Sequence, residues 1–164
     1  MTNPEVDEVL AVWRPYFEGI KDWEHEWQKL VAGVEPKATG CGPVYEIPNP
    51  IEGRPGESFA IADMRELEFA EPHYHTNGEI EIYVALTGMG TVVVGGKEAP
   101  LRPGVMSVTP PDTAHFVVPM HDLVIAVINM PPFNATNVVN LDPKTSNPTV
   151  GFDAEQLARL RQAA

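Results

Sequence analysis

The sequence lacks several features that would place the protein outside the cell, in a membrane or on nucleic acid. It has a single cysteine, Cys41, so no disulfide can form within the chain, and a reducing compartment is indicated. Only 11 lysines and arginines oppose 23 aspartates and glutamates, and the net charge of -12 disfavours binding to nucleic acid or anionic membranes. No apolar run approaches a membrane span, and the acidic start does not resemble a signal peptide. We therefore expect a cytoplasmic protein without nucleic-acid or membrane partners.

Length and composition predict one domain with many short strands. The chain has 164 residues, of which 43% are hydrophobic, and this suffices for one hydrophobic core. Its 17 prolines and 13 glycines predict frequent turns. We expect an N-terminal helical extension with a connecting loop over residues 1–56, an all-β core over 57–132, and a C-terminal loop with a short helix over 133–164.

The N-terminal extension shows the pattern of amphipathic helices. Asn3 and Pro4 are a typical capping residue and first helical residue. Large apolar residues follow mostly at spacings of three or four, namely Val6, Leu10, Trp13, Phe17, Ile20, Trp23, Trp27, Leu30 and Val31. Pro15 should break or kink this stretch, so we expect two shorter helices. We interpret the three tryptophans as packing against the main domain or in a dimer interface, rather than as a ligand platform.

The middle of the chain consists of short apolar segments separated by turns. We expect extended segments at 44–47, 59–63, 65–69, 80–86, 91–94, 98–101, 105–109, 114–118 and 123–129. Gly95-Gly96 is typical of a two-residue hairpin turn. Such a series predicts an antiparallel sandwich or barrel. Near the C-terminus, Asp153 and Gln156 form a capping pair that predicts a short helix.

Three histidines and a carboxylate form a candidate metal site. His73 and His75 would project from the same face of a strand, because alternate residues of a strand share a face. Glu79 and Glu81 share a face by the same rule, so parity does not choose between them. His115 would come from a different strand. Three imidazoles and one carboxylate suit Fe, Mn, Ni, Zn or Co and leave coordination positions open for a substrate.

Each of these residues also has an ordinary structural explanation, such as a hydrogen-bonded core histidine or a solvent-facing glutamate. Their combination, with turns at suitable separations, favours the metal site. We interpret His25 and His121 as surface residues. Cys41 has no histidine beside it in sequence, so we interpret it as structural.

These residues resemble the two sequence motifs of the cupin superfamily. His73-Tyr74-His75, followed by Glu81 and then by Gly88 after six further residues, resembles the first motif. Gly104, Pro110 and His115 are spaced like the second motif. The resemblance spans about Phe59 to Met130. It implies a double-stranded β-helix, or jelly-roll barrel, that holds a metal inside.

A narrower resemblance concerns the segment from Glu81 to Gly90, which is similar to the matching stretch of cupin-type glucose-6-phosphate isomerases. It implies Glu81 rather than Glu79 as the metal ligand or catalytic base, and Tyr83 as a substrate contact. The phosphate-binding segment of those enzymes is replaced here by a stretch that begins with Glu68 and includes Glu71, and these carboxylates would repel a phosphate.

The sequence therefore supports three hypotheses about function. The first is a metal-dependent isomerase of a sugar or sugar-phosphate-like hydroxy-carbonyl compound, in which Glu81 moves a proton between adjacent carbons and Tyr83 positions the substrate. The second is an Fe(II)-dependent dioxygenase, and the third is a non-catalytic protein that binds a small metabolite. We expect a homodimer with a small-molecule substrate. Candidate walls of the substrate cavity are Met106, Phe116, Val117 and Met120.

Overall fold

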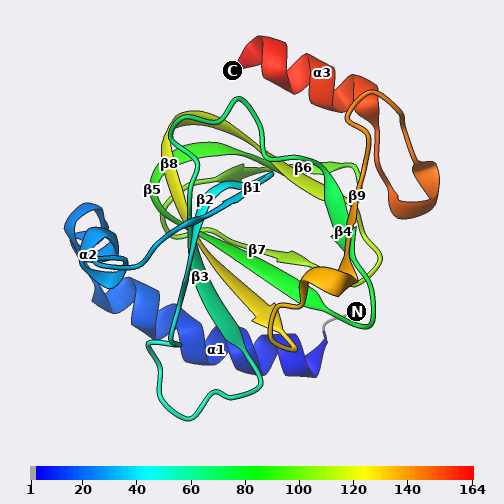
Figure 1. Cartoon of the computed structure of the whole chain (residues 1–164). Helices are drawn as coiled ribbons and strands as arrows, with labels where there is room; N and C mark the ends of the chain where they lie inside the picture. Colours follow the sequence, from blue (N-terminus) through cyan, green and yellow to red (C-terminus); the bar gives the residue numbers. More distant parts are fainter. Residues whose placement is uncertain (1–2) are drawn as a thin grey trace.

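The computed structural model describes residues 3–164, and it consists of a curled antiparallel sheet with helices on two sides (Figure 1). Two helices come first, α1 (Pro4–Gly19) and α2 (Trp23–Leu30). Nine strands follow: β1 (Lys37–Thr39), β2 (Gly42–Ile47), β3 (Ser58–Asp63), β4 (His73–His75), β5 (Ile80–Val94), β6 (Lys97–Leu101), β7 (Met106–Thr109), β8 (His115–Met130) and β9 (Val138–Asn140). Short 3-10 helices precede and follow β9, namely η1 (Ala135–Asn137) and η2 (Pro148–Val150), and the chain ends with α3 (Ala154–Ala163).

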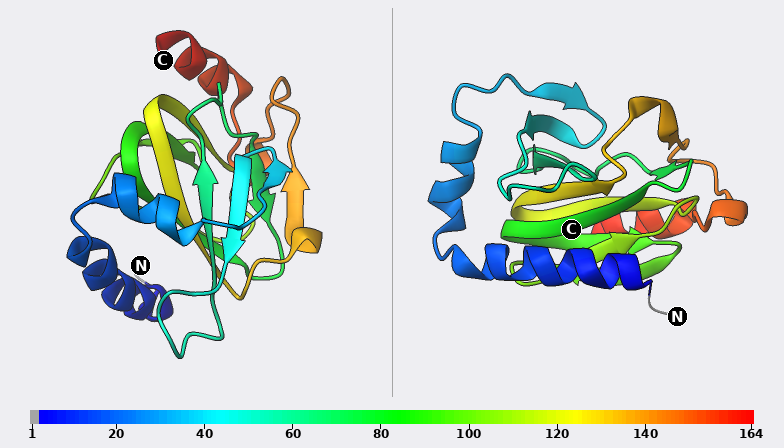
Figure 2. Two further views of the ribbon diagram at one scale, coloured as in Figure 1. Left: turned by 60° about the vertical axis from the view of Figure 1, so that its left-hand side comes forward. Right: turned by 90° about the horizontal axis from the view of Figure 1, so that it is seen from below.

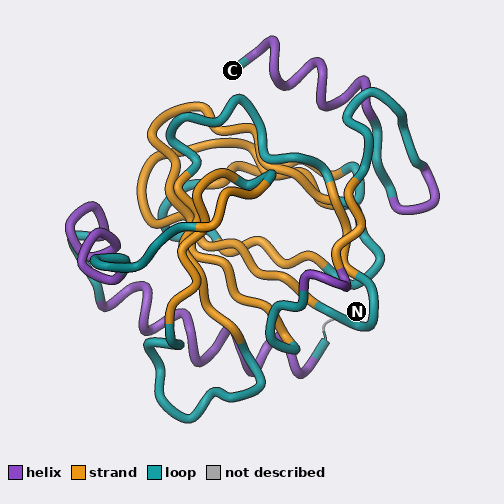
Figure 3. Tube along the Cα trace, viewed as in Figure 1, coloured by secondary structure: helices purple, strands orange, loops and turns teal. Residues whose placement is uncertain are grey.

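The strands form one antiparallel sheet that curls around a central space (Figure 3). One path through the sheet has the order β1-β2-β3-β8-β4-β9, and β5 pairs with β6, β7 and β8. The pairing of β5 with β8 is the longest, and it runs from Ile80 opposite Met130 to Val94 opposite His115. This arrangement confirms the predicted all-β barrel with flanking helices.

Four of the segments expected as separate strands join in the structure to form two long strands. The segments 80–86 and 91–94 join as β5, and 114–118 and 123–129 join as β8. Their pairing shifts register three times between Ala85 and Gly90, so both strands bend there without ending. Gly88 makes the bend possible: its φ is 72°, and a Cβ added to it would lie 2.3 Å from the backbone of Asp122.

The prediction of a strand at 65–69 is wrong. These residues form turns and bends. The backbone and the guanidinium of Arg65 both donate hydrogen bonds to Asp63, which turns the chain locally and competes with strand pairing. The short strands β1 and β9 were not expected. The hairpin turn at Gly95-Gly96 is confirmed, since both glycines have positive φ and Val94 pairs with Lys97.

The alternation of residues along β5 and β8 gives each strand two buried faces. Ile82 and Val84 of β5 and Ile128 of β8 belong to a hydrophobic cluster that includes the N-terminal helices. Tyr83 of β5 and Ile125 of β8 belong to a second cluster on the opposite face. Because both faces are covered, the two strands are almost continuously apolar, and the few polar residues on the inner face stand out.

The N-terminal helices begin as predicted but do not break at Pro15. The side chain of Asn3 accepts a hydrogen bond from the backbone N–H of Glu5, 3.0 Å away, and Pro4 occupies the first turn. Helix α1 continues through Pro15 to Gly19, so only one backbone hydrogen bond is lost inside it. The break comes at Ile20, whose backbone is extended, and α2 starts after the capping residue Asp22.

The aromatic face of α1 packs on the outer surface of the sheet (Figure 2). Trp13 is fully buried; its ring stacks on Phe59 of β3 at 5.2 Å and on Phe17 at 5.6 Å. Its indole N–H donates to Glu57 Oε2 at 2.8 Å. The tryptophans therefore pack within the chain, and they no longer supply a reason to expect a dimer.

This packing predicts a large loss of stability for Trp13→Ala. We expect the free energy of unfolding to fall by about 3–5 kcal/mol, because the substitution opens a cavity and leaves the buried Glu57 without its indole donor. Met120→Ala is the matched control, since Met120 is 53% exposed and should change stability by about 0.5 kcal/mol or less. Urea unfolding measures both variants, and similar values for the two would contradict the packing account.

Helix α3 covers the barrel on the side opposite α1 (Figure 1). Asp153 caps it as predicted, with its side chain 2.9 Å from the N–H of Glu155. Phe152, Leu157 and Leu160 are buried in a cluster with Phe116 of β8. The expected capping role of Gln156 is wrong, because its amide instead donates to the carbonyl oxygen of Gly96 and to Glu98.

Across residues 3–164 there is no helix with the length and apolar character needed to cross a membrane.

Candidate metal centre

The structure brings together the four residues proposed as metal ligands. His73 and His75 lie on β4, Glu81 on β5 and His115 at the start of β8. One ligand atom from each residue lies within 4.8 Å of the ligand atoms of the other three, and all four residues are buried. Antiparallel pairing places His73 directly opposite His115. We call these four residues the His3Glu group.

Glu81 lies at the centre of this group. Its Oε2 atom is 2.6 Å from His115 Nε2, 3.1 Å from His75 Nε2 and 3.7 Å from His73 Nε2. All three imidazoles thus present the same nitrogen, Nε2, to one region of space. Glu79, which parity alone left as an alternative, is outside the group.

The Nδ1 atoms point away from the group toward other acceptors. His73 Nδ1 lies 2.9 Å from the backbone oxygen of Glu71, and His115 Nδ1 lies 3.1 Å from that of Thr113. A carbonyl oxygen only accepts hydrogen bonds, so each of these Nδ1 atoms carries a proton, and Nε2 is the nitrogen of each ring that would bind a metal.

The charges of the group suit a cation. Burial raises the pKa of the Glu81 carboxyl, but its contacts with His115, His73 and His75 outweigh burial and hold that pKa well below its usual range. Burial lowers the pKa of His115 and favours its neutral form. For His75, burial also lowers the pKa, but contact with Glu81 outweighs it and the net direction is upward.

The residues present therefore fit a divalent metal. Three imidazole nitrogens and one charged carboxylate are a ligand set for such ions, and two of the imidazoles have their other nitrogen held by a backbone carbonyl. Four protein ligands leave positions free for substrate oxygens on a six-coordinate ion. The donor set alone does not select one of Fe, Mn, Ni, Zn or Co.

His73, His75 and Glu81 of the His3Glu group line a cavity of about 700 Å³ that opens to the surface, and His115 lies buried behind them. Tyr83 and Asn129 lie next to Glu81 on the inner face of the sheet, and Phe133 belongs to the loop that follows β8. Lys37 is the only basic residue among the described residues that line the cavity, and its Nζ lies 2.7 Å from Glu46 Oε2. The lining also includes Glu57, which pairs with Arg54, and Glu71, so Glu71 leaves the walls with net negative charge.

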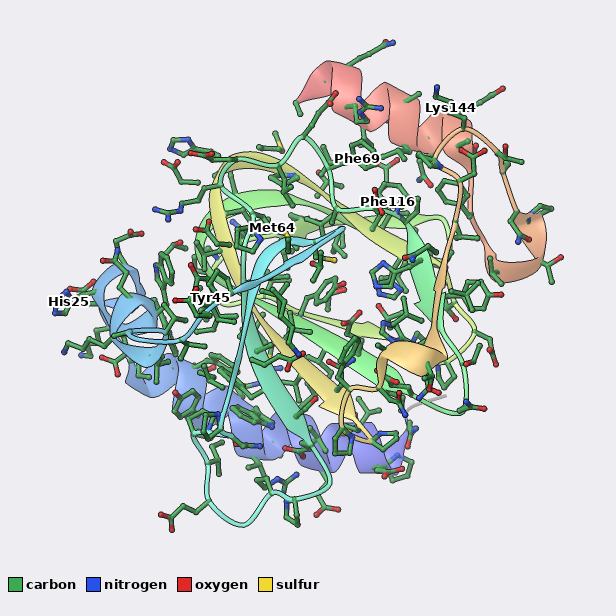
Figure 4. All side chains as sticks on the ribbon, in the orientation of Figure 1. His25, Tyr45, Met64, Phe69, Phe116 and Lys144 are labelled. Atoms are coloured by element: carbon green, nitrogen blue, oxygen red, sulfur yellow. The ribbon has the colours of Figure 1, made fainter. Side chains whose placement is uncertain are left out.

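Glu68 was expected, together with Glu71, to repel a phosphate, but Glu68 does not line the cavity. Its side chain pairs with Arg161 of α3, and that guanidinium also lies 4.4 Å from the Phe69 ring (Figure 4). Of these two carboxylates, Glu71 is therefore the one that can repel a negatively charged ligand in the cavity.

The four residues expected to form the cavity walls do not line it. Phe116 packs toward α3, Val117 belongs to the inner apolar cluster, Met106 packs with the N-terminal helices, and Met120 is 53% exposed. The sequence did not show which face of each strand would point inward. His25 and His121 are exposed as predicted, and Figure 4 shows His25 on the outside of α2.

Three residues of the cavity were not singled out in the sequence for a role there. Cys41 lies in the β1–β2 turn, and burial raises the pKa of its thiol to about 12, so it stays protonated. Asn129 faces Glu81 across the β5–β8 pairing, and Phe133 follows β8. A polar residue inside the apolar run of β8 was the one sequence signal available for Asn129.

Comparisons with known proteins agree with this geometry. Residues 52–128 match the model of the Cupin domain family. A Streptomyces PAC13 variant solved with uridine shares 12% identity at a TM-score of 0.57, covering 68% of this chain and 88% of that one. Another structure of the same protein describes it as a nucleoside dehydratase.

Two further solved structures have the same fold. A protein from Planctomyces limnophilus is 25% identical at a TM-score of 0.55, covering 66% of this chain and 90% of that one. A predicted oxalate decarboxylase from Thermotoga maritima is 20% identical at a TM-score of 0.51, covering 60% and 94%. No curated protein sequence matches the chain significantly. Residues 52–128 thus match a cupin domain, and the solved structures show that the chain shares their barrel fold.

Proposed function

We propose that this protein is a metal-dependent enzyme that moves a proton between adjacent carbons of a neutral, sugar-like hydroxy-carbonyl compound, as an isomerase does. The observation that carries the proposal is the position of Glu81. It is a buried, charged carboxylate inside a group of three imidazoles, and it faces an open cavity of about 700 Å³.

In this proposal His73, His75, Glu81 and His115 hold the metal. When bound there, a divalent ion would act as a Lewis acid toward the carbonyl and hydroxyl oxygens of the substrate. The same ligand set also suits an Fe(II) dioxygenase, so the experiment below measures oxygen consumption as well.

Glu81 has a second oxygen that is available for proton transfer. Its Oε2 faces the three imidazoles, whereas within residues 3–164 its Oε1 accepts one long hydrogen bond, 3.4 Å from Asn129 Nδ2. A carboxylate oxygen with a weak partner can accept a proton from a substrate carbon and return it to the neighbouring one. Tyr83 lies beside it, and burial raises the pKa of the Tyr83 hydroxyl far above neutrality, so this group donates hydrogen bonds and can orient the substrate.

The cavity favours a substrate without negative charge. Lys37 is already paired with Glu46 and Glu57 is paired with Arg54, whereas Glu71 adds negative charge to the walls. Apart from the metal, a phosphorylated substrate would find no unpaired lysine or arginine among the described lining residues, and it would face the Glu71 carboxylate. A neutral polyhydroxylated compound needs only hydrogen-bonding partners. The uridine in the Streptomyces structure shows that a barrel of this kind can hold a neutral ring-containing molecule.

Proton exchange with solvent tests this proposal. The metal-loaded protein is incubated without oxygen in D₂O with a panel of neutral aldoses and ketoses, and NMR follows deuterium at the carbons beside the carbonyl. Enzyme-dependent incorporation and interconversion support the proposal. Turnover that occurs only with stoichiometric oxygen consumption would replace it with the dioxygenase. Ligand binding without turnover under either condition would replace it with a non-catalytic binding role.

The cavity also predicts a role for Phe133 in substrate binding. Its ring is 42% exposed, lines the cavity and lies 6.3 Å from the His75 ring, while its backbone N–H donates to Ser58 Oγ. An ordered aromatic face of this kind can cover the apolar face of a sugar ring. We expect Phe133→Ala to raise KM about tenfold, corresponding to roughly 1.4 kcal/mol, with little change in kcat. Steady-state kinetics on the substrate found above measures this, and an unchanged KM would contradict it.

A further inference from the structure

The three histidines of the His3Glu group are not oriented in the same way. Backbone carbonyl oxygens accept from Nδ1 of His73 and of His115. The Nδ1 of His75 is buried and has no well-directed hydrogen bond within residues 3–164. The acceptor nearest to it is a side chain, Glu79 Oε1, at 3.0 Å. His75 is thus the one imidazole of the group whose orientation depends on a residue that mutation can change.

Glu79 is itself held by a set of donors. It is 0% exposed, and its Oε1 accepts from Asn129 Nδ2 at 3.0 Å, while its Oε2 accepts from Asn137 Nδ2 at 2.9 Å. Asn77 in turn donates to Asn137 Oδ1 at 2.6 Å. No lysine or arginine forms an ion pair with Glu79 in the described part of the chain. A buried carboxylate is costly without partners, so a carboxylate held only by amides and an imidazole indicates a specific role.

We propose that Glu79 is a positioning residue, which orients His75 through its Nδ1 and thereby sets the metal affinity of the His3Glu group. The inference rests on the proposed function only in assuming that this group binds a metal. Glu79 Oε1 lies 3.0 Å from the Nδ1 of His75 on the side away from the group, which leaves Nε2 as the nitrogen available to a metal. A carboxylate behind a metal-binding imidazole also makes that imidazole a stronger donor.

The same contacts give the C-terminal part of the chain a role in the site. Asn137 ends η1, which lies outside the predicted barrel core of residues 57–132. β9 follows η1 directly and pairs with β4, with Val138 opposite His75 and Asn140 opposite His73. Residues 133–140 therefore contact the two ligands of β4 in two ways. Strand β9 pairs with β4, and Asn137 holds Glu79, which lies next to His75.

Metal affinity and imidazole NMR test the proposal together. Zn²⁺ is titrated into metal-free wild type, Glu79→Gln, Asn137→Ala and the control Glu66→Gln, which changes an exposed glutamate. We expect Glu79→Gln to bind Zn²⁺ about 10- to 100-fold more weakly, the range that loss of such outer partners costs. Asn137→Ala, which removes one of the donors to Glu79, should weaken binding by a smaller factor, and Glu66→Gln should match wild type.

The NMR readout separates positioning from general stability. In ¹⁵N spectra of the metal-free protein, the Nδ1 signal of His75 should shift between wild type and Glu79→Gln, with the spectra of His73 and His115 unchanged. Equal Zn²⁺ affinity and equal His75 spectra in wild type and Glu79→Gln would overturn the proposal. If Glu79→Gln does not fold, Asn137→Ala decides, and unchanged affinity in that variant would overturn it. If wild type itself binds no metal, the proposed function fails, while the metal-free spectra still test the orientation of His75.

Discussion

Glu81→Gln is expected to lower kcat about 100- to 10,000-fold at saturating metal, the range that a general base contributes. The reason is that the substitution keeps the size of the side chain but removes the carboxylate that would carry the proton. KM should change far less, because in the proposed mechanism the substrate oxygens would bind to the metal and to groups such as Tyr83. Steady-state kinetics on the substrate identified by deuterium exchange measures both constants.

Two controls make this result interpretable. Glu66→Gln changes an exposed glutamate away from the cavity and should retain wild-type kinetics. Metal content is measured on the Glu81→Gln protein used for the assay, since Glu81 also belongs to the His3Glu group. Equal relative losses in kcat and in substrate affinity would show that Glu81 is a structural ligand only, and the proton-transfer role would be withdrawn.

His115→Ala is expected to weaken metal binding about 100-fold or more, because loss of a direct ligand should cost at least as much as loss of an outer partner. His115 supplies the imidazole closest to Glu81, at 2.6 Å, and it is fully buried. The barrel should persist, since β8 is held along its length by β5 and β3. Elemental mass spectrometry and circular dichroism measure the two properties on the same sample.

The exposed His25 supplies the matched control, since His25→Ala removes an imidazole from the surface of α2. It should keep wild-type metal content. Full retention of metal in His115→Ala, with an unchanged circular-dichroism spectrum, would remove His115 from the ligand set.

The site was predictable to the extent that it depends on local spacing. His73 and His75 share a face because alternate strand residues always do, and this required no tertiary information. The choice between Glu79 and Glu81 was different. Parity allowed both, and the structure shows why, since both side chains reach His75 from opposite sides. Their separate roles follow from the donors around each carboxylate, and those donors come from distant segments.

The fold shows the same division between local and distant information. Asn3 and Asp153 start their helices as predicted because a cap depends on neighbouring residues. The joining of β5 and β8 into long bent strands depends on Gly88 passing close to Asp122, a contact between distant positions. Pro15 lies inside α1 because the packing of the aromatic face on the sheet outweighs one lost hydrogen bond. The supporting role of Asn137 likewise depends on a segment far along the chain from Glu79.

The metal content of the purified protein tests the central claim most directly. The protein is prepared without chelator or metal-affinity resin and analysed by elemental mass spectrometry. We predict close to one equivalent of Fe, Mn, Ni, Co or Zn, either as isolated or after uptake by the metal-free protein. Iron would direct further work to oxygen consumption, and the other metals to sugar isomerisation. Absence of metal, with no uptake of any of these ions, would contradict the account.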